Sequence, residues 1–190
     1  MAPVVREARA ARSDDAGWVT AWPLWQRLLH AGLGLAVLSS LVTHEGGRWH
    51  EISGYAALGL AMLRLGVGLW GPVAARFRSF VQGPQATWAY ARQVRHRCAP
   101  RHLNHNPLGA WMVLALLLLT ALAGTSGALY VTDRFWGEAW VIVTHASTAW
   151  PLAGLVPLHL LGVWHASRAH HENLAAAMWH GRKAVRPGDR

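Results

Sequence analysis

Long apolar runs alternate with short polar stretches along the 190 residues of this chain. None of the runs shows the alternating pattern of a membrane barrel strand. Each is close to the ~20 residues that a helix needs to cross the hydrocarbon core of a bilayer. The pattern therefore predicts four transmembrane helices, at about Leu24–Val42, Glu51–Trp70, Leu108–Tyr130 and Trp140–Ser167.

The overall composition agrees with a membrane protein. Hydrophobic residues make up 53% of the chain and charged residues only 14%, whereas soluble domains carry about 25% charged residues. The first twenty residues lack the apolar core and small-residue cleavage site of a secretory signal, so we expect a cytoplasmic lead there. The single cysteine, Cys98, excludes an internal disulfide and the C-x-x-C-H site of covalent haem.

The distribution of basic residues predicts the orientation. Of the eighteen Lys and Arg, only Arg48 and Arg134 fall in the loops after the first and third apolar segments. Cytoplasmic loops of membrane proteins carry the excess of Lys and Arg, so both termini and the long loop at about 71–106 are expected in the cytoplasm. This topology also accounts for the formal net charge of +9, and nucleic-acid binding is therefore not expected.

Two histidines in the last apolar segment are the strongest chemical signal. His145 and His159 lie fourteen residues apart with no Lys, Arg, Asp or Glu between them. On a helix this spacing turns about 1400°, roughly 40° short of four full turns, and rises ~21 Å. Polar residues inside membrane helices are costly and point to function. Two imidazoles on one face, one towards each membrane surface, predict two stacked cofactors.

The predicted topology gives each histidine a partner at its own depth. His50 begins the second segment near the outer surface, level with His145, and His30 in the first segment lies near the cytoplasmic surface, level with His159. Two competitors lie six residues from these positions, which is 240° after one full turn and so a different helix face. They are His44 and His165, although His44 can lie in a loop, where the angular spacing of a helix does not apply.

Paired imidazoles suit haem better than zinc. Closed zinc sites use four protein ligands, whereas a low-spin haem needs two axial ligands. Glycines beside the histidines leave room for a macrocycle, although small residues also serve ordinary helix packing in membranes. They are Gly32, Gly34, Gly54, Gly59, Gly124, Gly127, Gly154 and Gly162.

Arg64 is expected at the depth of His30 and His159, because it follows His50 by fourteen residues on the same helix face. Haem propionates would supply the carboxylates that a buried Arg requires. Snorkelling of Arg64 to the cytoplasmic headgroups is the alternative.

These residues resemble the bacterial cytochrome b561 family and the cytochrome b subunits of membrane-bound nickel–iron hydrogenases. The resemblance covers nearly everything after about residue 22, through stretches that begin PLWQRLLHAGLG, HEISGYAALG, HNPLGAWMV and THASTAWPLAGLVPLH. In that family four helices hold two b-type haems through one His on each of the first two helices and two on the fourth. These positions are His30, His50, His145 and His159 here. The resemblance also implies quinone chemistry coupled to a redox partner.

The expected fold is therefore all-α, an integral four-helix membrane bundle in the bacterial inner membrane. We divide the chain into a lead at 1–20, a di-haem domain at 21–180 and a basic tail at 181–190. Asn106 is expected to cap the third helix and Pro107 to be its first residue. A further hypothesis places His105 or Asn106 near a quinone. Pro151 and Pro157 are expected to bend the fourth helix. The stretch HHENLAAAMWHGRK is expected to form a short interfacial helix.

The expected function is electron transfer between the quinone pool and a periplasmic partner, either a c-type cytochrome or a dehydrogenase or hydrogenase subunit. One alternative is a superoxide oxidase that passes electrons to ubiquinone. It requires a positively charged opening near the outer haem, for which Arg48 and Arg134 are the available residues. The other is a non-redox metal transporter that uses the histidines as a ladder.

Overall fold

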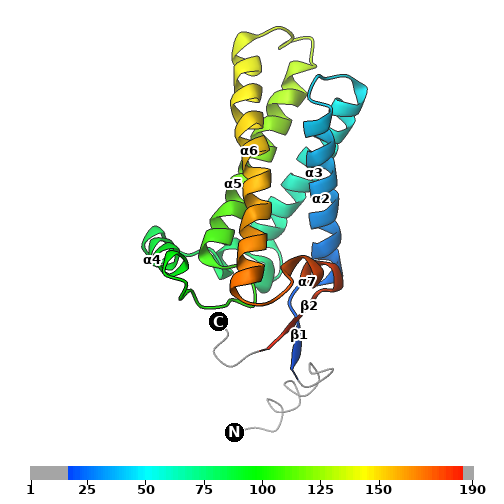
Figure 1. Cartoon of the computed structure of the whole chain (residues 1–190). Helices are drawn as coiled ribbons and strands as arrows, with labels where there is room; N and C mark the ends of the chain where they lie inside the picture. Colours follow the sequence, from blue (N-terminus) through cyan, green and yellow to red (C-terminus); the bar gives the residue numbers. More distant parts are fainter. Residues whose placement is uncertain (1–16, 186–190) are drawn as a thin grey trace.

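A computed structural model describes residues 17–185 of the chain and is mainly helical, as expected. Four long helices run side by side (Figure 1). They are α2 (Leu24–Val42), α3 (Arg48–Trp70), α5 (Pro107–Tyr130) and α6 (Ala139–Ala169). The predicted lead at 1–20 and tail at 181–190 lie partly outside the described residues, and the division into domains stays a prediction.

The observed helix bounds follow the hydrophobic pattern closely. α2 covers the predicted residues, and α5 and α6 extend the predicted segments by one or two residues at their ends. α3 begins three residues earlier than predicted, after Gly47, whose φ of 89° is costly for other residues. This places His50 inside the first turn of α3. The predicted cap of α5 is confirmed, since the Gly109 amide donates to the Asn106 side chain at 2.8 Å.

Three of the long helices, α3, α5 and α6, are long and apolar enough to cross a membrane. α2 is not among them, because its first two turns contain Gln26, Arg27 and His30. α6 continues through Pro151 and Pro157 as one helix of 31 residues. The bend predicted at these prolines stays a prediction.

The long helices pack in sequence around an apolar centre. α2 packs against α3, α3 against α5, and α5 against α6. The buried cluster at the centre comprises Ala36, Val37, Ala57 and Leu152. Ala57 lies midway between His50 and Arg64 on α3, and Leu152 lies midway between His145 and His159 on α6. The cluster is therefore at the middle of the helices, with candidate functional residues on either side.

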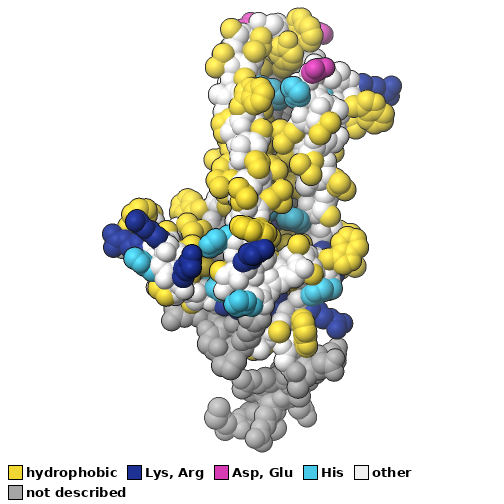
Figure 2. Space-filling model, viewed as in Figure 1, with side chains coloured by type: hydrophobic (Ala, Val, Ile, Leu, Met, Phe, Trp, Pro, Cys, Tyr) yellow, Lys and Arg dark blue, Asp and Glu magenta, His cyan; other side chains and the backbone are white. Residues whose placement is uncertain are grey.

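The outer surface of these helices is strongly apolar. Many large hydrophobic side chains are exposed on it, including Leu35, Leu63, Val143 and Leu160. Figure 2 shows hydrophobic side chains along the length of the helices, with charged side chains gathered towards the two ends. Exposed apolar surface of this extent marks contact with lipid or another apolar partner.

A small sheet lies at one end of the long helices, which we call the sheet end (Figure 1). Strand β1 (Trp18–Thr20) pairs antiparallel with β2 (Arg182–Ala184), with Val19 opposite Lys183. The short helix α7 (Leu174–His180) precedes β2 and occupies part of the predicted C-terminal helix. Hydrophobic patterning did not predict this sheet, because strands of three residues are too short to show a period. The opposite end, formed by residues 43–47 and 131–138, is called the loop end.

The segment at 71–106, predicted as a long loop, contains further helices. Two 3-10 turns, η1 (Val73–Ala75) and η2 (Phe77–Ser79), precede α4 (Pro84–Arg95). The prediction of a loop was wrong for α4, because a search for membrane segments overlooks a short polar helix. Pro84 occupies the first helical position, where its missing N–H removes no hydrogen bond.

Candidate cofactor-binding site

The structure brings His50 and His145 together at the loop end. His50 lies in the first turn of α3 and His145 in the second turn of α6. Their ring centroids are 6.0 Å apart, with an angle of 80° between the ring planes. These residues are 95 positions apart in sequence, so the pair exists only through the packing of the long helices.

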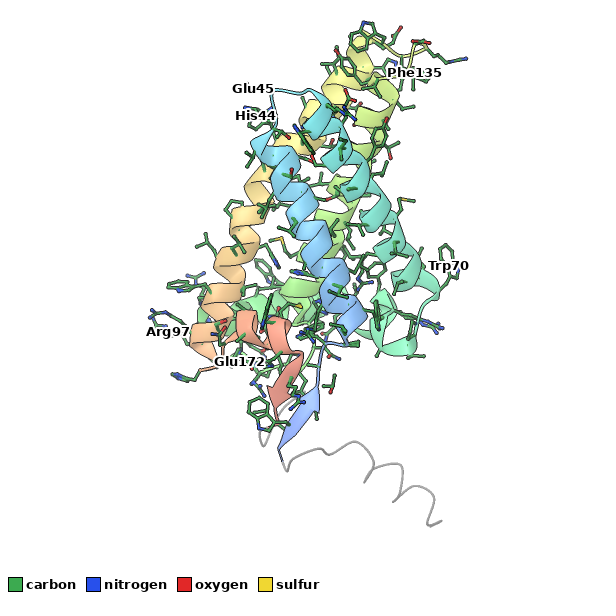
Figure 3. The ribbon with its side chains drawn as sticks, turned by 90° about the vertical axis from the view of Figure 1, so that its right-hand side faces the viewer. His44, Glu45, Trp70, Arg97, Phe135 and Glu172 are labelled. Atoms are coloured by element: carbon green, nitrogen blue, oxygen red, sulfur yellow. The ribbon has the colours of Figure 1, made fainter. Side chains whose placement is uncertain are left out.

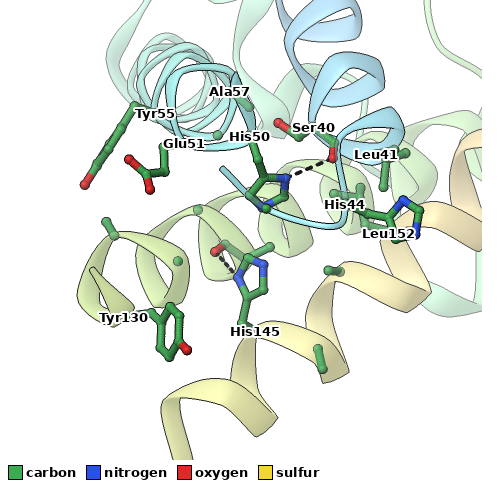
Figure 4. A pocket seen from close by; sticks show the side chains of 18 of the residues that line it. Ser40, Leu41, His44, His50, Glu51, Tyr55, Ala57, Tyr130, His145 and Leu152 are labelled. Atoms are coloured by element: carbon green, nitrogen blue, oxygen red, sulfur yellow. Dashed lines mark hydrogen bonds between the residues drawn. The ribbon is translucent and has the colours of Figure 1, made fainter. Parts of the chain in front are cut away.

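Each of these two rings is oriented by a hydrogen bond from its Nδ1 atom. His50 Nδ1 lies 3.1 Å from the Ser40 carbonyl oxygen, and His145 Nδ1 lies 2.9 Å from that of Ala123 (Figure 4). A carbonyl oxygen only accepts hydrogen bonds, so Nδ1 is the donor in both rings. In a neutral imidazole this leaves Nε2 unprotonated and able to bind a metal ion.

The two imidazoles line a large, mostly apolar cavity of about 780 Å³ at the loop end (Figure 4). This volume lies within the range of roughly 300–1,000 Å³ that is usual for small-molecule and cofactor sites. Small residues form much of its wall, among them Gly54, Ala57, Gly127 and Ala149. Gly127 lies against His145, because a Cβ atom at this position would be 3.1 Å from the Cε1 atom of the ring.

His30 and His159 form a second pair nearer the sheet end. Their ring centroids are 6.4 Å apart and their planes are inclined by 49°. His30 lies on α2 and His159 on α6. Neither ring forms a hydrogen bond with another part of the described chain, so the second pair lacks the carbonyl partners of the first.

Both separations suit a metal ion held between two imidazoles. An imidazole binds a metal ion through a ring nitrogen at about 2 Å. Rings with centroids 6.0 and 6.4 Å apart are close enough together that each pair would hold one ion in this way. Among residues 17–185, no three or more His, Cys, Asp or Glu side chains come together as a metal-binding group.

Arg64 lies on α3 at the level of the second pair and is 8% exposed. One guanidinium nitrogen donates to the Ala75 carbonyl oxygen at 3.4 Å, and the group lies 5.1 Å from the centre of the Phe77 ring. Arginine has five N–H donors. No carboxylate accepts from them within the described part of the chain, so Arg64 retains donors for an anionic group.

The competing histidines occupy different surroundings. His44 lines the same cavity as His50, but its ring lies beside Trp150 at a centroid distance of 6.5 Å. Figure 3 shows His44 at the loop end, beyond the last turn of α2. His165 is exposed on α6. Neither residue is brought against a second histidine within residues 17–185.

His105 lies in an aromatic cluster at the sheet end that sequence patterning did not predict. Its ring stacks on Phe80 at a centroid distance of 4.5 Å and meets the edge of Trp22 at 5.0 Å. Burial, together with the positive charges of Arg64 and Lys183, lowers the pKa of His105 to about 4. His105 is therefore neutral at physiological pH.

The comparison with protein families identifies the family of the chain. The family model described as prokaryotic cytochrome b561 matches residues 21–181. The chain belongs to the prokaryotic cytochrome b561 family. Members of this family bind b-type haem and transfer electrons across a membrane, and the expectation of the family from sequence is confirmed. Comparisons with curated proteins and with solved structures gave no significant match.

The residues of this cytochrome suit b-type haem. At each of the two levels, two imidazoles lie close enough together that they would hold one haem iron between them, with ring centroids 6.0 and 6.4 Å apart. The cavity beside His50 and His145 is apolar and of cofactor size, and glycines in its wall leave space near the rings. Pairs of histidines without additional acidic or thiol ligands match haem better than a closed zinc site.

Sequence reasoning named the histidines but missed the groups that orient them. The Ser40 and Ala123 carbonyl oxygens carry no sequence signal, because every residue has one. For Ser40 the sequence gives one indirect signal. It lies in the last turn of α2, where carbonyl oxygens lack partners within the helix and are available to other donors. The contacts of His105 with Trp22 and Phe80 join segments far apart in sequence and left no periodic pattern.

Proposed function

We propose that this cytochrome b561 holds two b-type haems, one between His50 and His145 and the other between His30 and His159. The supporting observation is the recurrence of the same arrangement at two levels of the long helices, with imidazole centroids 6.0 and 6.4 Å apart. Haem supplies one-electron redox chemistry when it is bound. The histidines ligate and orient it, and the apolar helices exclude water from around it.

The proposal includes a four-helix membrane bundle with α2 as the fourth spanning helix. α2 has 19 residues, close to the length needed to cross a bilayer, and it packs against α3 along its length. The polar residues in its first turns lie at the sheet end. This end is assigned to the cytoplasm, because the excess of Lys and Arg falls on its side of the helices. Both termini are then cytoplasmic, in the bacterial inner membrane.

Arg64 is proposed to bind a propionate of the haem near the sheet end. It is buried at the level of His30 and His159, and only one of its hydrogen bonds is directed to the described chain. A charged group this deeply buried requires an anionic partner. A propionate carboxylate provides one through charge-assisted hydrogen bonds.

The proposed activity is electron transfer between the quinone pool and a periplasmic redox protein, such as a c-type cytochrome or a dehydrogenase or hydrogenase subunit. The apolar cluster of Ala36, Val37, Ala57 and Leu152 separates the two histidine pairs. It provides a dry, low-dielectric layer between the two redox levels. Acidic residues Glu45 and Glu51 at the loop-end cavity are suited to a basic partner.

The same cavity disfavours superoxide as the substrate. Glu45 and Glu51 are among its lining residues, whereas Arg48 and Arg134 are not. Carboxylates at the opening repel the superoxide anion. A metal transporter would need a succession of sites along a pathway, but the interior histidines form two separate pairs near opposite ends.

Electron transfer across liposome membranes tests the proposal. Purified protein is reconstituted with ferricyanide trapped inside, and dithionite is added outside. We expect rapid reduction of the trapped ferricyanide with the wild-type protein and slow reduction with protein-free liposomes. The His50→Ala variant is expected to retain haem at the other level but to lose transfer. In detergent, decylubiquinol is expected to reduce the haems.

Three results would contradict the proposal. The first is purified protein without a haem absorption band in the Soret region. The second is haem-loaded protein that transfers electrons no faster than empty liposomes. The third, which would remove the quinone from the proposal, is haem that dithionite reduces and decylubiquinol does not.

A further inference from the structure

Helix α4 presents a basic and aromatic face to its surroundings. Trp88, Arg92 and Arg95 follow one another at spacings of four and three residues, which places them within roughly 60° of arc. All three are exposed, with Trp88 at 64%, and the Arg92 guanidinium lies 5.7 Å from the centre of the Trp88 ring. We call these three residues the α4 basic face.

The opposite side of α4 is packed against the protein. Tyr90 is buried, and its ring meets that of His102 at a centroid distance of 5.4 Å. The indole nitrogen of Trp111 on α5 donates to the Gln82 carbonyl oxygen and lies at the same distance, 3.1 Å, from the Thr87 hydroxyl. The orientation of α4 is therefore set by α5 and the 96–106 segment, and the α4 basic face points away from them.

The position of α4 places this face at the level where helices enter the lipid headgroups. Trp111 is the fifth residue of α5, a helix apolar and long enough to cross a membrane. Figure 1 shows α4 to the side of α5 and α6, near the sheet end, and not on the axis of the bundle. A helix beside the end of a membrane span lies over the surrounding lipid.

A second tryptophan–arginine pair lies at the end of α6. Trp164 and Arg168 are four residues apart, and the guanidinium is 5.1 Å from the centre of the indole ring. Trp164 is 57% exposed. Tryptophan is enriched at membrane interfaces, and arginine near a helix end extends its charge to the headgroups. Lys and Arg side chains gather over α4 and towards this end of α6 in Figure 2.

The charge of the segment determines which headgroups suit it. Residues 71–106 contain six arginines and no Asp or Glu. Each basic residue near an anionic bilayer surface raises binding by about fivefold. Arginine also binds phosphate in a bidentate manner, which lysine does not.

From these observations we infer that the α4 basic face, together with Trp164 and Arg168 near the same end of α6, is a binding surface for anionic phospholipid headgroups. Trp88 and Trp164 lie at the acyl–headgroup boundary, and Arg92, Arg95 and Arg168 contact the phosphates. This inference goes beyond electron transfer and depends only on the placement of the long helices in a bilayer.

Cys98 allows a local test, because it is the chain's single cysteine, is exposed, and lies three residues after α4. The haem-loaded protein in neutral detergent is labelled there with a donor fluorophore. It is then titrated with acceptor-labelled phosphatidylglycerol or phosphatidylcholine. We expect half-maximal energy transfer at a several-fold lower concentration of phosphatidylglycerol than of phosphatidylcholine. This preference for the anionic lipid is expected to decrease in high salt.

Variants assign the preference to the α4 basic face. R92Q/R95Q is expected to lose most of the preference, whereas R92K/R95K, which keeps the charges but not the bidentate geometry, is expected to retain part of it. R48Q/R134Q removes the same number of charges at the loop end and is expected to leave it unchanged. The haem absorption spectrum, recorded on every sample, reports on the cofactor sites independently.

Two outcomes would overturn the inference. One is wild-type protein labelled at Cys98 that shows the same energy transfer with phosphatidylglycerol as with phosphatidylcholine. The α4 basic face would then be assigned to a soluble acidic partner. The other is a preference that R92Q/R95Q and R48Q/R134Q reduce equally, which would reflect net charge alone.

Discussion

At the scale of single residues, the loop-end site depends on backbone groups as much as on histidines. The Ser40 and Ala123 carbonyl oxygens fix the Nδ1 atoms of His50 and His145 and so select the tautomer with a free Nε2. The spacing of His145 and His159 predicted two levels on one helix, and the structure places one partner beside each of them. The donors and acceptors behind the rings could not be predicted, because they depend on how closely α2 and α5 approach.

Gly127→Ala tests how strictly the loop-end site needs this close approach. The added Cβ would lie 3.1 Å from His145 Cε1 and 3.3 Å from Nδ1, so the ring must move away from α5. Changes behind a metal ligand typically cost 10–100-fold in affinity, and we expect haem to transfer from the variant to apomyoglobin about tenfold faster. Gly66→Ala is the control, since its Cβ meets no atom within 4 Å. Equal rates for the two variants would contradict the role of Gly127.

His105 predicts a loss of stability in acid. Its folded-state pKa is about 4 against an ordinary value of 6.5, so between these values the unfolded chain binds more protons than the folded chain. Stability therefore falls as pH decreases from 6.5 towards 4, by about 2 kcal/mol at pH 5. His105→Phe keeps a ring beside Phe80 but cannot titrate. We expect its thermal midpoint to fall less than that of wild type between pH 7 and pH 5. Exposed His165→Phe is expected to behave as wild type, and a wild-type response from His105→Phe would refute the assignment.

At the scale of elements, hydrophobic patterning predicted the helices that pack through apolar faces and missed those that do not. α2, α5 and α6 match their predicted bounds to within one or two residues, because long segments rich in apolar residues determine them. α4 and the β1–β2 sheet depend on specific long-range contacts. Trp111 holds α4, and the Ala21 and Trp22 amides both donate to the Gly181 carbonyl oxygen beside the sheet. Such contacts leave no period in the sequence.

Glu172 lies between α6 and α7 at the sheet end, where Figure 3 shows it below α6. It joins this turn to Arg101, in the segment after α4, and to Lys183 on β2. It accepts from Arg101 at 2.6 Å and from Lys183 at 3.5 Å, and the side chains of all three are nearly buried. Glu172→Gln removes the carboxylate that these two nearly buried cations share, which we expect to cost about 2 kcal/mol. For a chain of this length that loss lowers the thermal midpoint by about 4–8 °C.

Glu138→Gln is the matched control for this change, because Glu138 is an exposed carboxylate at the loop end. It is expected to leave the thermal midpoint within about 1 °C of wild type. Hydrogen exchange is expected to increase in β1 and β2 of Glu172→Gln and to stay unchanged in the central turns of α5. Unchanged exchange in the sheet would show that Glu172 does not hold these elements together.

At the scale of the whole molecule, two histidine pairs lie on either side of an apolar layer. This arrangement follows from a fourteen-residue interval on α6 and from the antiparallel course of α2 and α3, which carry one partner each. The sequence thus predicted both levels and the family. The redox partner and the quinone site are not determined by these intervals, because they depend on surfaces and loops without a repeating pattern.

The most direct test of the central claim is the haem-to-protein ratio, measured by the pyridine haemochrome method across single and double histidine variants. We expect two haems in wild type and one in His50→Ala or His159→Ala. Within one pair, H50A/H145A is also expected to retain one haem, whereas H50A/H159A, which removes a ligand from each pair, is expected to retain none. Equal haem content in the two double variants, or a single haem in wild type, would contradict the claim.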